Sequence, residues 1–364
     1  MNNSLTANRS STAQRARAPS HRIADDRVML RAAADLTRDL IQPKPAIYWG
    51  DMAGSALVGY AALIAAATAS STWLALAAGI VSVLALYRAL LFIHEISHVK
   101  HAALPHFRLG WNALVGVPML TPSFMYEGVH NLHHAKTRYG TTDDPEYLPL
   151  ASMKPWTLPL FILISLLAPV GLLIRFAILS PLSVLIPALR RPVVERFSAL
   201  AINPDFRRRV PEGEAMVQFN RIDTAASIWA MSLMVLVATG LVPLRAFLVA
   251  LGIMSGVAVL NQVRTLVAHL WENEEGEAMS VTAQYLDSVN VPPPSTLPAL
   301  WAPVGLRYHA LHHLLPGLPY HALGEAHRRI SAALEQGSPY HKASYAGLPG
   351  LVRHLVANTM RPVR

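Results

Sequence analysis

Apolar runs dominate the hydropathy pattern of the chain. Four of them are close to or above the length of about twenty residues that a membrane-spanning helix needs. These runs are residues 47–70, 72–93, 225–241 and 246–268. Only a short uncharged turn near Ser71 separates the first two runs, and a turn around Pro243 separates the last two. The pattern therefore predicts an all-α integral membrane protein with four transmembrane helices in two hairpins.

Two further apolar stretches are less regular. Residues 156–189 are long enough to span a membrane but are interrupted by Arg175 and by several prolines, among them Pro169 and Pro181. Residues 111–125 are too short to span. We expect both stretches to form interfacial or re-entrant helices, in addition to a cytoplasmic helical cap.

The distribution of basic residues predicts the orientation in the membrane. Both hairpin turns are nearly free of Lys and Arg, whereas the N-terminal segment, residues 190–221 and the C-terminal third are rich in them. The positive-inside rule then places both turns outside and both termini in the cytoplasm. Keeping residues 190–221 inside requires an even number of crossings before them, which is why residues 156–189 are not expected to be a simple span.

The N-terminal segment differs in composition from the rest. Residues 1–45 are basic, with little apolar periodicity and no cleavable signal peptide, and predict a flexible cytoplasmic arm ahead of a membrane domain at 46–364. An Arg- and Ser-rich start is also typical of an organellar transit peptide, and this alternative stays open.

Composition narrows the chemistry. The chain has 364 residues, of which 52% are hydrophobic and 15% charged, with a mean hydropathy of +0.32, values typical of a membrane protein. It has no cysteine, which excludes disulfides, thiolate-bound zinc and iron–sulfur clusters within this chain. The net charge of +9 is spread beside apolar segments, which favours anionic lipid or an acidic protein partner and argues against nucleic acid.

Eight of the sixteen histidines fall in three compact groups. The groups are His94 and His98; His130, His133 and His134; and His309, His312 and His313. Residues three or four positions apart share one helix face, so each group can direct its rings to one point. A single histidine on an apolar helix is more often a hydrogen-bonded core residue than a ligand, but three repeated groups predict metal binding.

A ninth histidine, His269, ends the last apolar run, with Asn261 and Thr265 two turns and one turn before it. The first histidine group begins where the second apolar run ends, so all the groups are expected on the cytoplasmic face. Eight or nine imidazoles exceed one coordination sphere, which predicts two metal ions; imidazole suits zinc, copper, nickel and iron alike.

The three groups follow the patterns HxxxH, HxxHH and HxxHH, and in them the chain resembles the membrane fatty acid desaturase family over nearly all residues after 45. Residues 287–290 and 315–321 resemble bacterial members, which implies a bacterial inner membrane. The resemblance implies a non-heme di-iron site with the ligands His94, His98, His130, His133, His134, His269, His309, His312 and His313. Family members hold a water with an Asn one turn before the isolated histidine; here Thr265 has that position, and Asn261 lies a turn further away.

The resemblance also implies the reaction, an O2-dependent introduction of a C=C bond into the acyl chain of a lipid. The chain has no cysteine and no Gly-rich dinucleotide motif. Electrons must therefore come from a separate carrier, such as a ferredoxin with its reductase. A hydroxylase and a decarboxylase that forms a terminal alkene are alternatives on the same scaffold.

Metal-bound imidazoles usually donate their second nitrogen to a carboxylate or a carbonyl. The acids near the groups in sequence are Glu95, Glu127, Asp143, Asp144, Glu146 and Asp287. Each could equally be a solvated loop residue or a helix cap. Asp143 and Asp144, which closely follow the second group, are the preferred pair.

Two other classes of protein stay open. Residues 94–98 match the HExxH pattern of a zinc protease, with Glu95 as the general base and Asn203-Pro204-Asp205 as a possible third-ligand motif. This reading leaves both HxxHH groups unexplained. A metal-binding or transport protein would carry polar groups deep in its spans, and few occur, mainly Asp51, Arg88 and Arg175.

Overall fold

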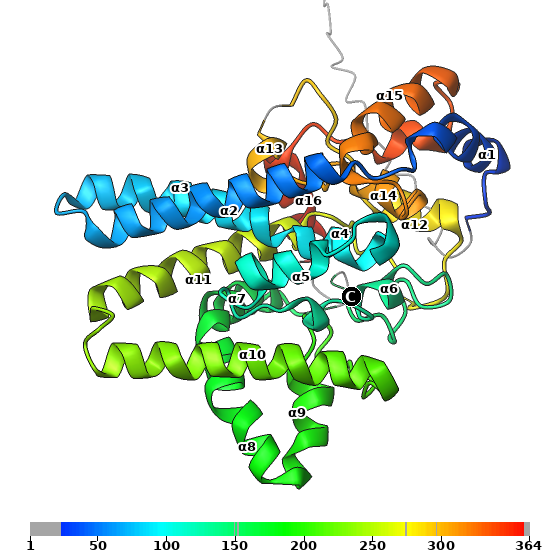
Figure 1. The fold of residues 1–364 in the computed structure, drawn as a ribbon. Helices are drawn as coiled ribbons and strands as arrows, with labels where there is room; N and C mark the ends of the chain where they lie inside the picture. The colour runs from blue at the N-terminus through cyan, green and yellow to red at the C-terminus, as the bar shows by residue number, and fades with distance from the viewer. Residues whose placement is uncertain (1–22, 149, 151–152, 274, 296, 360–364) are drawn as a thin grey trace, which may run out of the picture.

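Helices make up the regular structure of the part of the chain that the computed structural model describes, residues 23–148, 150, 153–273, 275–295 and 297–359 (Figure 1). Its longer helices are α1 (Arg27–Leu36), α2 (Pro45–Thr68), α3 (Thr72–Leu90), α7 (Thr157–Ile174), α10 (Gly213–Ala238), α11 (Leu244–Leu266), α15 (Leu323–Ala333) and α16 (Leu348–Thr359). Its shorter helices are α4 (Phe92–His98), α5 (Phe107–Trp111), α6 (His130–His133), α8 (Ser180–Leu185), α9 (Arg190–Phe197), α12 (Val281–Asp287), α13 (Pro298–Trp301) and α14 (His309–Leu314). The described residues form isolated β-bridges but no strand, which confirms the all-α prediction.

Five helical runs are long and apolar enough to cross a membrane, one more than the four predicted. They are Pro45–Thr68, Thr72–His98, Thr157–Leu185, Gly213–Ala238 and Leu244–Leu266. Four of them overlap the predicted spans. The additional run joins α7 and α8 through a π-helical segment at Arg175–Leu179, where an interfacial or re-entrant segment was expected. Several apolar helices of this length indicate a multi-pass membrane protein.

The hairpin of α2 and α3 follows from local chemistry. Pro45 stands in the first turn of α2, and the Ser71 side chain caps α3 by accepting a hydrogen bond from the Leu74 amide. The two helices approach closely at Gly59, where a Cβ atom would lie 2.6 Å from Leu86 Cδ2. The small residue thus permits the tight packing that helices need in lipid, where the hydrophobic effect supplies little attraction.

The second hairpin, α10 and α11, turns at Gly240, whose positive φ of 77° suits glycine. α11 packs against α2, α3 and α7. α10 begins twelve residues before the predicted span at 225, and its first turns include Asp223, which forms buried ion pairs with Arg175 at 3.0 Å and Arg190 at 2.9 Å. These pairs bind α10 to the segment of α7 to α9. Together α8 and α9 project beyond α10 as a V-shaped pair (Figure 1).

The structure describes residues 111–125 and part of the predicted N-terminal arm. Residues 111–125 form short helical turns and no long helix, and the Trp111 indole donates to the Ala89 carbonyl of α3 at 2.9 Å. The predicted arm lies outside the described residues as far as residue 22. Its described part contains α1, which Asp26 caps and which packs with buried Met29 and Ala33 against Ile330 of α15.

Candidate metal centre

The structure brings all nine predicted ligand histidines together at one end of the helical bundle, on α4, α6, α14 and the residues just after α11. They form two clusters, each with its donor nitrogens within 4.8 Å of one another. The five-histidine cluster comprises His94, His98, His130, His134 and His312. The four-histidine cluster comprises His133, His269, His309 and His313.

Both HxxHH groups are divided between the two clusters. In the group at α6, His130 and His134, which directly follows the helix, belong to the five-histidine cluster, and His133 belongs to the other. On α14 the division is reversed, because His312 joins the five-histidine cluster while His309 and His313 join the four-histidine cluster. Histidines four apart share a cluster in both groups, so each group supplies ligands to both clusters.

Distances within the clusters suit a bound metal. In the five-histidine cluster, Nε2 of His134 lies 3.0 Å from Nε2 of His130 and 3.1 Å from Nε2 of His312. In the four-histidine cluster, Nε2 of His309 lies 3.1 Å from those of His269 and His313. Two ligands at right angles on one metal, with bonds of about 2.1 Å, would have their nitrogens about 3.0 Å apart. The donor set therefore fits metal ions of this bond length.

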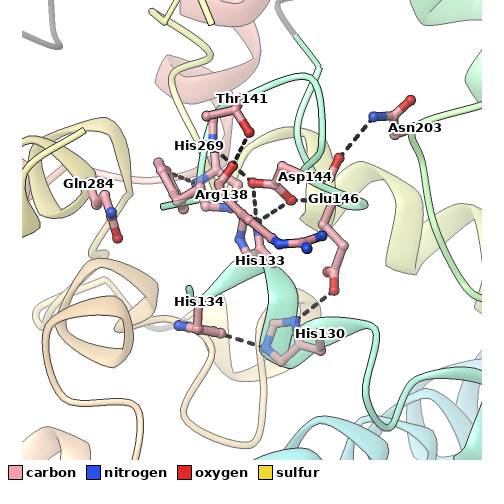
Figure 2. Close-up of polar contacts among 12 residues, drawn as sticks. His130, His133, His134, Arg138, Thr141, Asp144, Glu146, Asn203, His269 and Gln284 are labelled. Carbon is pink, nitrogen blue, oxygen red and sulfur yellow. Dashed lines mark hydrogen bonds and ion pairs between the residues drawn. The ribbon is translucent and has the colours of Figure 1, made fainter. Parts of the chain in front are cut away.

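Asp144 holds the outer side of the four-histidine cluster. Both of its carboxylate oxygens lie near His133 Nδ1, at 2.9 and 3.0 Å. The carboxylate is fully buried and also accepts hydrogen bonds from the amides of Gly140 and Glu146. The Asn203 side chain donates a hydrogen bond to the backbone carbonyl of Asp144 at 3.0 Å, which helps to hold the loop that carries Asp144 (Figure 2). Asp144 thus holds the His133 ring with Nε2 free to face the cluster.

Glu146 does the same for the five-histidine cluster. Its Oε1 lies 2.7 Å from His130 Nδ1, and Tyr126 donates to its Oε2 at 2.8 Å. Burial raises the pKa of Glu146 to about 7. The loop after α6 therefore supplies a carboxylate to each cluster, as Figure 2 shows for Asp144 and Glu146.

His269 is held through a tyrosine that sequence reasoning missed. The Tyr139 hydroxyl lies 2.9 Å from His269 Nδ1 and 2.9 Å from Asp287 Oδ2, so it connects the ring to the carboxylate. The Ser288 hydroxyl lies 3.2 Å from the same nitrogen. Burial raises the pKa of Asp287 to about 7. Asp287 therefore acts on the histidine indirectly, and no spacing in the sequence marks Tyr139.

Glu95 is buried on α4 between His94 and His98 in sequence. Its Oε1 lies 3.5 Å from His94 Nδ1, but its hydrogen bonds are made by Oε2 with other elements. The Tyr48 hydroxyl and the Tyr320 amide both donate to Glu95 Oε2. The carboxylate thus connects α2, α4 and the segment after α14.

The other residues that were expected beside the metal ligands do not contact the cluster histidines by a described hydrogen bond. Asp143 is exposed, and Glu127 accepts a hydrogen bond from Ser123 at 2.6 Å and faces Arg108. Asn261 contacts Arg264 at 3.4 Å. Thr265 is buried in the last turn of α11, without a described hydrogen bond to a cluster histidine.

The electrostatics of the clusters favour neutral rings. Burial and the neighbouring histidines hold the pKa well below its usual range for six of them, His130, His134, His269, His309, His312 and His313. For His133, burial disfavours the charged ring, but Asp144 outweighs it and raises the pKa. Both ring nitrogens of His94 and Nε2 of His133 are buried without a hydrogen-bond partner. Neutral imidazoles with unused nitrogens are what a metal requires.

The geometry disfavours the two other classes. His94 and His98 share their cluster with three further histidines, and Asp205 of the possible protease motif is exposed. The main polar groups in the apolar runs, Asp51, Arg88 and Arg175, are neutralised in pairs. Asp51 accepts a hydrogen bond from Arg88 at 2.7 Å, and Arg175 forms an ion pair with Asp223. These contacts explain the intramembrane charges without a transport path.

Comparison with known proteins bears on the same residues. The profile of the family described as fatty acid desaturase matches residues 71–344. The chain is 52% identical, over 325 residues, to a ceramide hydroxylase of Caulobacter vibrioides, an alignment that covers 89% of this chain and 92% of that protein. No solved structure matches the chain. The match includes all three histidine groups and His269, and it confirms the family resemblance: the chain belongs to the fatty acid desaturase family and is an oxidoreductase.

Proposed function

We propose that this protein is a membrane-bound, O2-dependent di-iron hydroxylase that acts on a ceramide-type N-acyl lipid. The observation that carries the proposal is the pair of adjoining histidine clusters in a chain that is 52% identical to a ceramide hydroxylase over nearly its whole length. Desaturation of the acyl chain, the outcome that the family resemblance implies, is the second candidate and is compatible with the family profile.

The nine cluster histidines would hold the two irons, five around one ion and four around the other. The nitrogen spacing of 3.0–3.1 Å and the unpartnered ring nitrogens support this assignment. When bound, a pair of irons with O2 supplies the oxidising power that an unactivated C–H bond requires, which acid–base chemistry cannot supply.

The protein's own residues would position the ligands and exclude water. Asp144, Glu146 and Tyr139 accept from, or bridge to, the outer nitrogens of His133, His130 and His269, so that the inner nitrogens point into the clusters. All nine rings except those of His98 and His134 are buried. A dry, preformed site protects the substrate from side reactions with water.

Electrons would come from outside the chain. It has no cysteine for an iron–sulfur cluster, so a separate donor such as a ferredoxin with its reductase would supply two electrons per turnover. The net charge of +9 suits an acidic donor.

We also propose that only four of the five long helical runs cross the membrane. His133 and His269 lie in one cluster, so the chain between them must cross the membrane an even number of times. α10 and α11 supply two crossings, which leaves the run Thr157–Leu185 as an interfacial or re-entrant element. Both termini and the clusters would then face the cytoplasm of a bacterial inner membrane.

Lipid analysis of cells tests the proposed function. Ceramide-producing bacteria that express the wild-type protein should accumulate ceramide with one additional oxygen atom. The His309→Ala variant should lose this product, and the control His101→Ala, which alters a mostly exposed histidine outside the clusters, should retain it. Loss of two hydrogen atoms would indicate the desaturase, and a terminal alkene the decarboxylase.

Metal analysis of the purified protein tests the cofactor separately. About two irons per chain are expected from two clusters. A single zinc per chain would contradict the di-iron assignment and favour the protease.

A further inference from the structure

A small cavity lies beside the four-histidine cluster. Arg264, Trp301 and His309 contribute to its wall, and the remainder is mainly apolar, including Val267, Val291 and Leu306. Its free volume of about 10 Å³ accommodates at most one water molecule or one substrate oxygen atom.

Arg264 is a buried cation without an anionic partner. It stands in the last turn of α11 and is 7% exposed. Its Nε has no hydrogen-bond partner, and the acceptors of its guanidinium are neutral, namely Asn261 Oδ1 at 3.4 Å and the Tyr87 hydroxyl. Among the described residues no carboxylate lies within ion-pair distance of it. Burying a charge without a partner is costly, so such residues usually serve a ligand.

Two more nitrogens at the same cavity lack an acceptor. They are Trp301 Nε1 and His309 Nδ1. Because His309 Nε2 faces His269 and His313 in the cluster, its Nδ1 carries the proton when Nε2 binds a metal. Arg307, which also lines the cavity, differs because its guanidinium donates to the carbonyls of Val291 and Ser295. Three of the residues that line the cavity thus each carry a buried nitrogen without a hydrogen-bond partner.

We propose that this cavity binds the acyl carbonyl oxygen of the substrate, with Arg264 and Trp301 as the donors that determine specificity. The inference rests on the proposed function, because it assigns the polar group of that same lipid. The cavity adjoins His309, a member of the four-histidine cluster. Oxidation is therefore expected within a few carbons of the carbonyl and not in the middle of the chain.

Lipid binding to the purified, iron-loaded full chain in nanodiscs tests the site. The probes are a ceramide, its thioamide analogue, in which a larger and weakly accepting sulfur replaces the carbonyl oxygen, and a free fatty acid of equal chain length. The wild type should bind the ceramide about 10-fold more tightly than the thioamide, as expected for one hydrogen bond to a charged donor. Arg264→Met should reduce this preference to less than about 3-fold.

Controls separate this role from a structural one. Arg245→Met changes the same residue type at the other end of α11, where it contacts the Ala69 carbonyl, and should keep the wild-type preference. Trp301→Phe removes one donor, and it should lower the preference if Arg264→Met fails to fold. Iron content should stay unchanged in every variant.

Each outcome decides between readings. An unchanged preference in both Arg264→Met and Trp301→Phe would overturn the proposal and assign the cavity to an ordered water. Equal wild-type affinity for ceramide and thioamide would also overturn it. If the wild type binds the fatty acid more tightly than the ceramide, and Arg264→Met loses this difference, the cavity binds a carbonyl oxygen but the substrate is a free acid. A preserved preference without oxidation of the ceramide would contradict the proposed function but not this site.

Discussion

The outer nitrogen of a cluster histidine decides where its inner nitrogen points. His133, His130 and His269 each have an oxygen partner at Nδ1, supplied by Asp144, Glu146 and Tyr139. The ring planes are thereby held before a metal arrives, which lowers the entropic cost of binding it. Removal of such partners typically weakens metal affinity by about 10- to 100-fold.

Neighbouring acids in the loop after α6 offer a matched test of this effect. Asp144→Asn keeps the shape of a fully buried side chain but removes its charge from His133. We expect metal retention during dialysis against a chelator to fall by about 10-fold. Asp143→Asn alters an exposed side chain one residue away and should retain metal like the wild type. Equal loss from the two variants would contradict the role of Asp144.

Tyr139 provides a second test at this scale. Tyr139→Phe removes the hydroxyl that joins His269 to Asp287 and leaves the buried carboxylate with one donor fewer. We expect turnover to fall by about 10-fold with the fold intact. Tyr60→Phe, which loses one hydrogen bond to the Leu114 carbonyl far from the clusters, should keep wild-type turnover. Wild-type turnover in Tyr139→Phe would show that Ser288 alone holds the ring.

Eight of the nine cluster histidines could be predicted from the sequence because their signal is local, whereas the isolated His269 was identified as a ligand through the family resemblance. Helical spacing of three and four residues is visible without knowing the fold. The partners could be predicted only in part, since Asp144 and Glu146 stand near His133 in sequence but so does exposed Asp143. Tyr139 lies far in sequence from both His269 and Asp287, so only the folded chain shows its role.

At the scale of elements, close helix contact holds the membrane hairpins together. The apolar runs predicted α2, α3 and α11 well, because lipid requires long helices with satisfied backbone groups. The start of α10 was predicted too late, because its first turns are polar and pair with a neighbouring segment. A hydropathy pattern does not show ion pairs between segments, such as the one between Arg175 and Asp223.

Glycines of α2 test the hairpin contact. A Cβ at Gly59 would meet Leu86, including its backbone nitrogen at 3.0 Å, whereas nothing lies within 4 Å of a Cβ at Gly54. Gly59→Val should therefore destabilise the protein by about 1–3 kcal/mol through overpacking. Gly54→Val carries the same change in helix propensity without the clash. Thermal unfolding in detergent should separate the two variants, and equal melting temperatures would contradict the packing described.

At the scale of the whole molecule, the two clusters constrain the topology. Ligands that are distant in sequence meet on one face only if an even number of crossings separates them. Under the proposed topology, this condition makes the run Thr157–Leu185 an interfacial or re-entrant element, which neither its length nor its hydropathy would indicate. The basic residues that follow this run in the sequence lead to the same prediction, which the labelling experiment below tests.

Cysteine labelling measures the topology directly, because the natural chain has no cysteine. An impermeant thiol reagent applied to spheroplasts should label Ser71→Cys and Leu241→Cys in the hairpin turns. Gln336→Cys and Ala188→Cys, both exposed in the structure, should react only after lysis. Labelling of Ala188→Cys before lysis would make Thr157–Leu185 a full span and contradict the proposed arrangement.

The central claim, oxygen insertion by a di-iron site, is tested most directly with isotopically heavy O2. Purified iron-loaded protein, a ceramide and a reducing system are incubated under this gas, and the lipid product is measured by mass spectrometry. We expect ceramide with one heavy oxygen atom from the wild type and none from His309→Ala. A product that lacks two hydrogens and contains no new oxygen, or whose new oxygen comes from water, would contradict the claim.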